Sequence, residues 1–181
     1  MTPTNNIMFE PLKAVDYQYA CQLYEDAFPM EERRNTSEWL LQYQQNPLFN
    51  ILCIKQERSY QGILSYWDFE SFYYIEHFAI STQNRGTGIG SAALELFTAT
   101  RALYPIILEV EPDTDDTTHR RILFYKKHRF QIIDHPYLQP PYHKGGSSFP
   151  LNIMCNDVNF ANRNFNNIVR IIHHQVYHYI K

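Results

Sequence analysis

The stretch that decides the fold runs from Tyr73 to Ser91 and reads YYIEHFAISTQNRGTGIGS. Its first eight residues are mostly aromatic or β-branched, which is typical of a strand. Three of the chain's six glycines follow, at positions 86, 88 and 90, and helically spaced apolar residues come after them. A strand, a glycine turn and a helix in this order form a device that holds a phosphate, because the free N–H groups of the first helical turn point at the anion.

The spacing of the glycines limits which phosphate ligand this turn can hold. A P-loop requires a lysine directly after its last glycine, and this stretch contains none. A dinucleotide fingerprint requires G-x-G-x-x-G/A; residues 86–88 supply its first half, but Ser91 stands where the third small residue belongs. Glu109 and Glu111, about twenty residues further on, resemble the ribose-binding acid of that fingerprint. A nucleotide-binding oxidoreductase is therefore one alternative.

The pattern Gln83-x-x-Gly86-x-Gly88, with a strand before it and a helix after it, resembles motif A of the GNAT-type N-acetyltransferases. In that family the loop binds the pyrophosphate of coenzyme A, so the resemblance implies acetyl-CoA as the cosubstrate. It also implies that the main-chain groups of Phe78 and Ile80 bind the pantetheine arm. The residues that it assigns to the cofactor-binding loop are Gln83, Asn84, Arg85, Gly86, Thr87, Gly88, Ile89, Gly90 and Ser91.

The order of elements around the loop favours the acetyltransferase over the oxidoreductase. Residues 49–55, 62–69 and 72–80 read as three strands whose short links make them antiparallel neighbours, whereas a dinucleotide-binding unit places a helix between strands. Residues 105–111 read as a strand that a helical crossover makes parallel to the one before the loop. The predicted fold class is α/β (α+β): a GNAT-like mixed, mostly antiparallel twisted sheet flanked by helices.

The rest of the chain completes that order. We predict a strand at 7–10, helices at 14–28 and at 117–128, a helix capped by Thr36 or Ser37, and strands at 130–133 and 149–155. Thr117 or Thr118 is expected to cap the later helix. Residues 135–150 hold four prolines and two glycines, which indicates a loop. The predicted acetyltransferase domain covers residues 1–155, and residues 156–181 form an extra C-terminal helical extension.

The C-terminal extension carries an apolar stripe that needs a cover. The residues on this helical face are Phe165, Ile168, Val169, Ile172, Val176, Tyr179 and Ile180. Either the same domain or a second subunit covers them, so both a monomer and a homodimer are open. His174 and His178 lie four residues apart on the same helix, but two histidines without a carboxylate partner more often form a solvated face than a metal site. No metal is expected.

Composition sets the broad class. The 181 residues fit one domain, and 44% hydrophobic residues supply a substantial core. A net charge of −3 argues against nucleic acid as a partner. The three cysteines are widely spaced and odd in number, which suggests a reducing compartment. We find neither a signal-peptide pattern nor a membrane-spanning apolar run, so the expectation is a cytoplasmic protein that does not bind membranes.

Glu76 is the first candidate for the catalytic base. Acetylation of an alkylamine needs a base because the amine has a pKa of about 10.4. A carboxylate in an otherwise apolar strand is unusual, and the family often places its base on this strand. Side-chain alternation puts Glu76 on one face with Phe78 and Ile80, and puts His77 on the other. Glu109 and Glu111 on the next strand compete with Glu76 for this role.

Tyr125 is the candidate general acid. The segment at 121–130 resembles the family's later motif, in which Phe-Tyr precedes a helix end and a Gly-Phe. By this resemblance Tyr125 contacts the sulfur of coenzyme A and returns a proton to it. The sequence departs from the motif at Arg129, where a glycine is common, and a non-glycine residue in a left-handed helix end costs about 1 kcal/mol.

The acceptor is the least determined part. Glu31, Glu32 and the loop that contains Tyr142 lie where this superfamily usually builds its acceptor pocket, and acidic and aromatic groups suit a cationic amine. A small-molecule or peptide amine is the expected substrate. Since none of the cysteines lies in a recognisable nucleophile setting, direct transfer in a ternary complex is expected. A non-catalytic acyl-CoA-binding or regulatory module is the other alternative.

Overall fold

The structure is a computed structural model that describes residues 6–179. Its strands are β1 (Ile7–Pro11), β2 (Phe49–Gln56), β3 (Ser59–Asp68), β4 (Tyr73–Ile80), β5 (Ile106–Val110), β6 (Gln131–Ile132), β7 (Tyr137–Gln139) and β8 (Phe149–Cys155). Its α-helices are α1 (Tyr17–Ala27), α2 (Thr36–Gln45), α3 (Ile89–Thr100), α4 (Asp116–Lys127) and α5 (Val158–Gln175). Short 3₁₀ turns are η1 (Ala14–Asp16), η2 (Met30–Glu32) and η3 (Thr82–Asn84).

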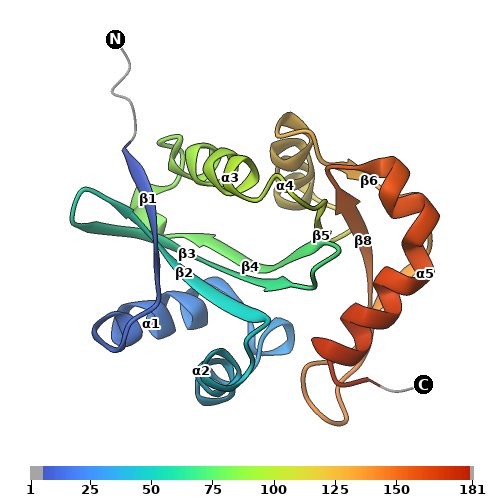
Figure 1. Cartoon of the computed structure of the whole chain (residues 1–181), viewed down its shortest axis with the longest axis horizontal. Coiled ribbons are helices and arrows are strands. Elements are labelled where there is room, and N and C mark those ends of the chain that lie inside the picture. Colours follow the sequence, from blue (N-terminus) through green and yellow to red (C-terminus); the bar gives the residue numbers. More distant parts are fainter. Residues whose placement is uncertain (1–5, 180–181) are drawn as a thin grey trace.

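The strands form one mixed sheet in the order β1-β2-β3-β4-β5-β8-β6, with β7 paired to β8. The pair of β4 with β5 is parallel, and the other pairs are antiparallel. For β2, β3, β4 and β5 these directions are the ones that the link lengths predict. Helices α3 and α4 lie on one side of the sheet and α1 and α2 on the other, while α5 lies beside β8 (Figure 1). The predicted fold class is confirmed.

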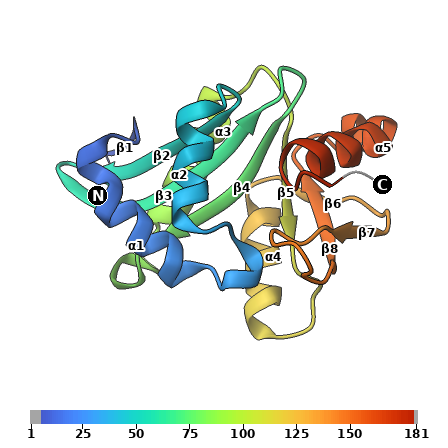
Figure 2. The ribbon, with the colours of Figure 1, turned by 90° about the horizontal axis from the view of Figure 1, so that it is seen from below.

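Each face of the sheet has its own apolar core. On the side of α1 and α2, which Figure 2 shows in front of the sheet, the core includes the fully buried Trp39 and Trp67. On the side of α3 and α4 it includes Phe97 and Ile122. Alternate residues of β4 feed the two cores, with Tyr74 on the first side and Tyr73 and Ile75 on the second.

A β-bulge in β4 overturns one prediction about the site. Ser65 pairs with His77 and the next residue of β3 pairs with Ile75, so Glu76 is the extra residue. An inserted residue resets the alternation of side chains. Glu76 therefore bonds to Trp67 on the side of α1 and α2, and His77 packs on that side too. The predicted shared face of Glu76 with Phe78 and Ile80, which pack on the side of α3 and α4, is wrong.

Two predicted helix caps and one predicted loop also need correction. Asn35 rather than Thr36 or Ser37 is the N-cap of α2. Asp115 rather than a threonine caps α4, and its carboxylate accepts the N–H groups of the next turn. Asp has one more acceptor oxygen than Thr and is among the preferred N-cap residues. The segment 135–150 is not only a loop, because β7 forms within it and pairs antiparallel with β8.

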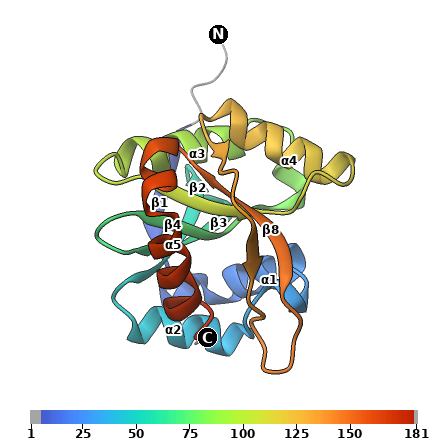
Figure 3. The ribbon, with the colours of Figure 1, turned by 90° about the vertical axis from the view of Figure 1, so that its right-hand side faces the viewer.

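The apolar stripe of α5 packs against the core of the same chain. Ala161, Ile168, Ile172 and Val176 are buried in the core on the side of α1 and α2. The helix runs from the side of the sheet where α4 lies to the side where α2 lies (Figure 3). Tyr179 of the predicted stripe is exposed, and Ile180 lies outside the described residues. None of the helices in residues 6–179 is long and apolar enough to cross a membrane.

Candidate active site

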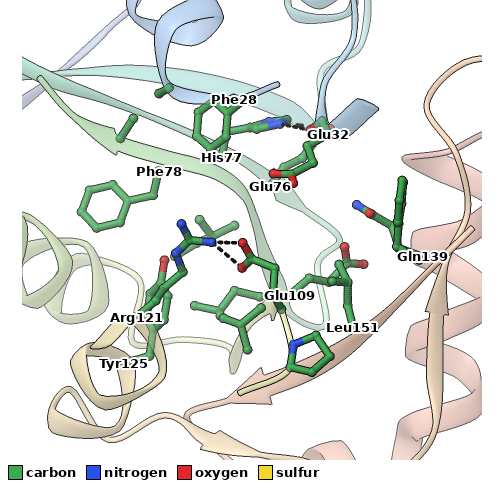
Figure 4. Close-up of a pocket in the computed structure, with 18 of the residues that line it drawn as sticks. Phe28, Glu32, Glu76, His77, Phe78, Glu109, Arg121, Tyr125, Gln139 and Leu151 are labelled. Atoms are coloured by element: carbon green, nitrogen blue, oxygen red, sulfur yellow. Dashed lines mark hydrogen bonds and ion pairs between the residues drawn. The ribbon is translucent and has the colours of Figure 1, made fainter. Parts of the chain in front are cut away.

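A pocket of about 470 Å³ lies where β4 and β5 separate. The two strands pair over only three positions, the last being Ile75 with Leu108, and they part at the bulged Glu76. The pocket is lined by the diverging ends of both strands, by the connection between α1 and α2, by α4, and by the β7–β8 hairpin. Tyr125 and Arg121 lie on one wall and Gln139 and Leu151 on the opposite one (Figure 4).

The glycine loop after β4 has a backbone shaped for close approach of a ligand. Gly86 and Gly88 have φ values of 77° and 88°, a region that favours glycine. A Cβ atom added to Gly86 would meet no atom within 4 Å, so the space above it is open. Gly88 is the N-cap of α3 and brings no side chain, which leaves the first amide groups of α3 for an anion. These features fit the pyrophosphate of coenzyme A.

The other predicted loop residues surround this backbone. Thr87 donates a hydrogen bond to the Asn84 carbonyl at 2.6 Å, which tightens the turn, and Gln83 is exposed. Arg85 lines the pocket, as do Phe78 and Ile80 of β4. In the first turn of α3, Ile89 is buried in the core and Gly90 packs beside Ile80. The Ser91 hydroxyl lies 3.0 Å from Nε2 of His128.

The carboxylate of Glu76 is engaged by donors on both oxygens. Arg34 forms an ion pair with Oε1, Tyr142 donates to the same oxygen at 2.9 Å, and Trp67 donates to Oε2 at 2.6 Å. The side chain is completely buried. Burial alone would raise the pKa of Glu76, but Arg34, His77 and Trp67 outweigh it and hold the pKa below its ordinary value. This environment favours the ionised carboxylate.

Glu109 has the opposite environment. Tyr137 donates a hydrogen bond to one oxygen, and Tyr177 donates to the other at 2.7 Å. Both partners are neutral hydroxyls. Burial raises the pKa of Glu109 to about 7, although these hydroxyls and Tyr74 act in the other direction. Glu109 lines the pocket, so the structure brings to this site a carboxyl group whose pKa is raised toward neutral pH.

On the wall formed by α4, Tyr125 faces the pocket with a protonated hydroxyl. Burial raises the pKa of Tyr125 to about 12, with a smaller opposing effect of Arg121. Arg121 forms an ion pair with Glu111, the third carboxylate that the sequence offered as a base. Both carboxylate oxygens of Glu111 bond to this guanidinium, so Glu111 is already engaged by a cation, whereas Glu109 accepts only from hydroxyls.

The predicted acceptor residues separate in the structure. Glu32 and Tyr142 line the pocket with Phe28, whereas Glu31 is exposed and is not part of the lining. Burial raises the pKa of Glu32, and Glu111 adds to this. The loop after β7 reaches across to η2, where Nε2 of His143 lies 3.0 Å from the Met30 carbonyl oxygen. Among residues 6–179 no group of three or more His, Cys, Asp or Glu side chains forms a metal site.

Several residues of the site escaped prediction from the sequence. Arg34 is the last residue of the charged segment after α1, residues 31–34. Nothing in that segment indicated that Arg34, rather than one of its neighbours, pairs with Glu76. Trp67 and Tyr177 come from β3 and the segment after α5. Because these residues lie far from β4 and β5 in the chain, no sequence pattern indicated that they meet those strands. The strand pattern of β3 would have suggested only that Trp67 faces a core.

Comparison with known proteins identifies the family. No family model matches the chain. A segment of 108 residues is 32% identical to the "Putative acetyltransferase YjbC" of Bacillus subtilis, and it spans 58% of this chain and about half, 52%, of that relative. A solved "Putative acetyltransferase from GNAT family" from Bacteroides thetaiotaomicron is 33% identical, with a TM-score of 0.88 over 96% of this chain and 99% of that one.

More distant structures share the fold. A spermidine N-acetyltransferase from Vibrio cholerae, solved with CoA and spermine, has a TM-score of 0.60 at 13% identity, and covers 82% of this chain and 94% of its own. The Bacteroides thetaiotaomicron protein, however, combines sequence identity with nearly complete coverage of both chains. This chain therefore belongs to the GNAT family of acetyltransferases.

Proposed function

We propose that this protein transfers an acetyl group from acetyl-CoA to a primary amine by direct transfer in a ternary complex, with Glu109 as the general base and Tyr125 as the general acid. The observation that carries the proposal is the position and environment of Glu109. It lines the pocket between the separated strands, and its pKa of about 7 suits a base that works at neutral pH. The glycine loop also supports the proposal, because its open backbone and the first amide groups of α3 suit the pyrophosphate of coenzyme A.

The roles of the side chains follow from their chemistry. Acetyl-CoA supplies an activated thioester carbonyl. Glu109 accepts the proton of the ammonium form, since an alkylamine with a pKa of about 10.4 is mostly protonated at neutral pH. Tyr125 keeps its proton until a thiolate leaves, because its pKa of about 12 lies above neutral pH. The main-chain N–H groups of β4 that face the separated strands are available to stabilise charge on the carbonyl oxygen.

Direct transfer is supported by the cysteines. Cys21, Cys53 and Cys155 lie outside the set of residues that line the pocket. Burial raises the pKa of each of these thiols, to about 12 for Cys53 and about 11 for Cys155. A thiol with a raised pKa is a poor nucleophile at neutral pH. An acetyl-cysteine intermediate therefore has no suitable residue to form on.

Glu76, the base favoured by the sequence, is the competing assignment. Its oxygens are occupied by Arg34, Tyr142 and Trp67, and the pKa is lowered, both of which weaken it as a base. We infer that Glu76 holds the bulged strand to the charged segment after α1. The acceptor itself, a small-molecule or peptide amine, would enter between Glu32 and the β7–β8 hairpin.

The test is acetyl-CoA-dependent thiol release across a panel of amines. In Glu109→Gln, turnover at neutral pH should fall about 100-fold and recover as the pH approaches the pKa of the amine. Glu76→Gln should lower activity evenly at every pH, and Tyr125→Phe should lower turnover about ten- to a thousandfold with acetyl-CoA affinity retained. A recoverable loss in Glu76→Gln alone would transfer the base role to Glu76. Acetyl-CoA binding without thiol release for any amine would favour the non-catalytic binding module.

A further inference from the structure

We propose that Tyr177, in the segment after α5, is a positioning residue for Glu109, so that the C-terminal extension completes the catalytic pocket. The inference rests on the proposed role of Glu109 as the base. It assigns a function to a segment that the sequence analysis described only as an additional helix with a stripe to be covered. The pocket would then depend on residues far beyond β8.

The hydrogen bonds around Tyr177 fix the direction in which its hydroxyl donates. The Gln139 side-chain amide nitrogen lies 2.6 Å from the Tyr177 oxygen and can only donate to it. A carboxylate oxygen is a stronger acceptor than a hydroxyl, so the Tyr177 hydroxyl donates to Oε2 of Glu109, 2.7 Å away, rather than to Tyr74. The Tyr74 hydroxyl lies 3.2 Å from the Tyr177 oxygen. Tyr177 is 7% exposed, so water does not readily replace these partners.

The preceding residue contacts the cation that pairs with the other pocket carboxylate. The carbonyl oxygen of Val176 accepts a hydrogen bond from the Arg34 guanidinium, and the same guanidinium forms the ion pair with Glu76. Ile172 and Val176 are completely buried in the core, which fixes the end of α5 against the sheet. Two consecutive residues of the extension thus contact Glu109 directly and Glu76 through its partner Arg34, and this is more than the covering of an apolar stripe requires.

The groups that face Glu109 come from three directions. Tyr74 and Glu76 belong to β4, Tyr137 to β7, and Tyr177 to the C-terminal segment. The three hydroxyls stabilise the ionised carboxylate, while Glu76 opposes it through its like charge. Loss of the Tyr177 hydroxyl removes one donor to the ionised form. The pKa of Glu109 should then rise further, and less of the base should be ionised at neutral pH.

The experiment compares Tyr177→Phe with Tyr179→Phe. Tyr179 lies in the same segment and is exposed, and its ring packs on His173 rather than on Glu109, so it is the matched control. With ¹³C-carboxyl-labelled glutamate, the NMR signal absent from Glu109→Gln identifies Glu109. Its titration midpoint should move upward by about one pH unit in Tyr177→Phe. The acidic limb of kcat/KM should move by the same amount, and both should stay in place in Tyr179→Phe.

Each outcome decides between two claims. An unchanged NMR midpoint in Tyr177→Phe overturns the inference. A shifted midpoint with an unchanged kinetic limb shows that Tyr177 contacts Glu109 but overturns its catalytic meaning. Full activity of Glu109→Gln defeats the proposed function instead. If Tyr177→Phe does not fold, fluorotyrosine at position 177 keeps the shape and donates more strongly, so the midpoint should move downward, and no movement would overturn the inference.

Discussion

At the scale of single residues, the pocket contains two glutamates whose pKa values are shifted in opposite directions. Glu76 accepts hydrogen bonds from a cation, an indole and a phenol, and its pKa is lowered. Glu109 accepts hydrogen bonds from tyrosine hydroxyls, and its pKa is raised to about 7. Two neighbouring acids pushed apart in pKa can divide structural and proton-transfer roles between them. The partners, rather than the residue type, make this division.

The raised pKa of Glu109 predicts a pH dependence of stability. A carboxyl group with a raised native pKa contributes stability below its unfolded pKa, here 4.5, and that contribution is lost as the pH rises through about 7. Glu109→Gln cannot ionise. Urea unfolding at pH 5 and pH 8 should therefore show that the wild type loses more stability than this variant over the interval.

The control for this measurement is Glu57→Gln, a change at an exposed position in the turn between β2 and β3. It should follow the wild type at both pH values. Parallel pH dependence of the wild type and Glu109→Gln would mean that Glu109 titrates in the native state as it does in the unfolded chain. The kinetic assignment of the base would then lose its physical basis.

Predictions about single residues succeeded where a residue's conformation follows from its near neighbours in the sequence. The positive φ values of Gly86 and Gly88 agree with the interpretation of the loop. It failed for the face of Glu76, because strict alternation assumes an uninterrupted ladder and the bulge lies between Glu76 and β3. A bulge depends on the pairing of two strands, so one strand's sequence does not reveal it.

At the scale of elements, the end of α4 carries a strain that can be relieved. Arg129 has a φ of 70°. Its N–H donates to the Lys126 carbonyl, and the N–H of Phe130 donates to the Tyr125 carbonyl. This is the Schellman arrangement, which normally uses glycine at the left-handed position. Arg129→Gly should therefore raise the free energy of unfolding by about 1 kcal/mol in a urea titration.

The matched control is Arg120→Gly within the same helix. Arg120 is exposed and helical, so glycine there should lower the stability by about 1 kcal/mol. Opposite signs for the two changes are expected. Equal destabilisation by both would show that the Arg129 side chain contributes more than its backbone conformation costs.

Element boundaries followed from the sequence better than their caps did. The strands β2, β3 and β4 and the helix α4 lie within a few residues of the predicted ranges, because apolar periodicity extends over their whole length. The caps depend on a single side chain each, and several candidates stood side by side at both helix starts. The strand β7 has three residues beside prolines, too few for a periodic pattern, and exists through its pairing with β8.

At the scale of the whole molecule, the pocket is assembled from contacts between distant parts of the chain. Arg34 meets the carbonyl of Val176 across 142 residues, and Tyr177 meets Glu109 across 68. Such contacts follow from the docking of α5 against the sheet, which a single sequence does not specify. The glycine loop was predictable because it is continuous in the sequence. The carboxylate environments were not, because their partners come from strands and connecting segments that lie far apart in the chain.

A ligand that binds only the native state should stabilise the whole molecule, and this yields the last prediction. Acetyl-CoA should raise the Tm, and NAD and NADP should do so much less. Gly88→Asp and Gly88→Asn add side chains of equal size at the N-cap of α3, where φ is 88°. Asn tolerates this conformation and is neutral, while Asp places a negative charge at the anion site.

The Asp variant should therefore lose the Tm shift with acetyl-CoA, and the Asn variant should keep more of it. Because the two variants share the cost of a side chain at this position, the difference between them isolates the electrostatic repulsion of the pyrophosphate. Equal shifts in both variants would mean that the anion binds elsewhere than at the start of α3. A larger shift with NADP than with acetyl-CoA would remove the ligand on which the proposed reaction depends, whatever the state of Glu109.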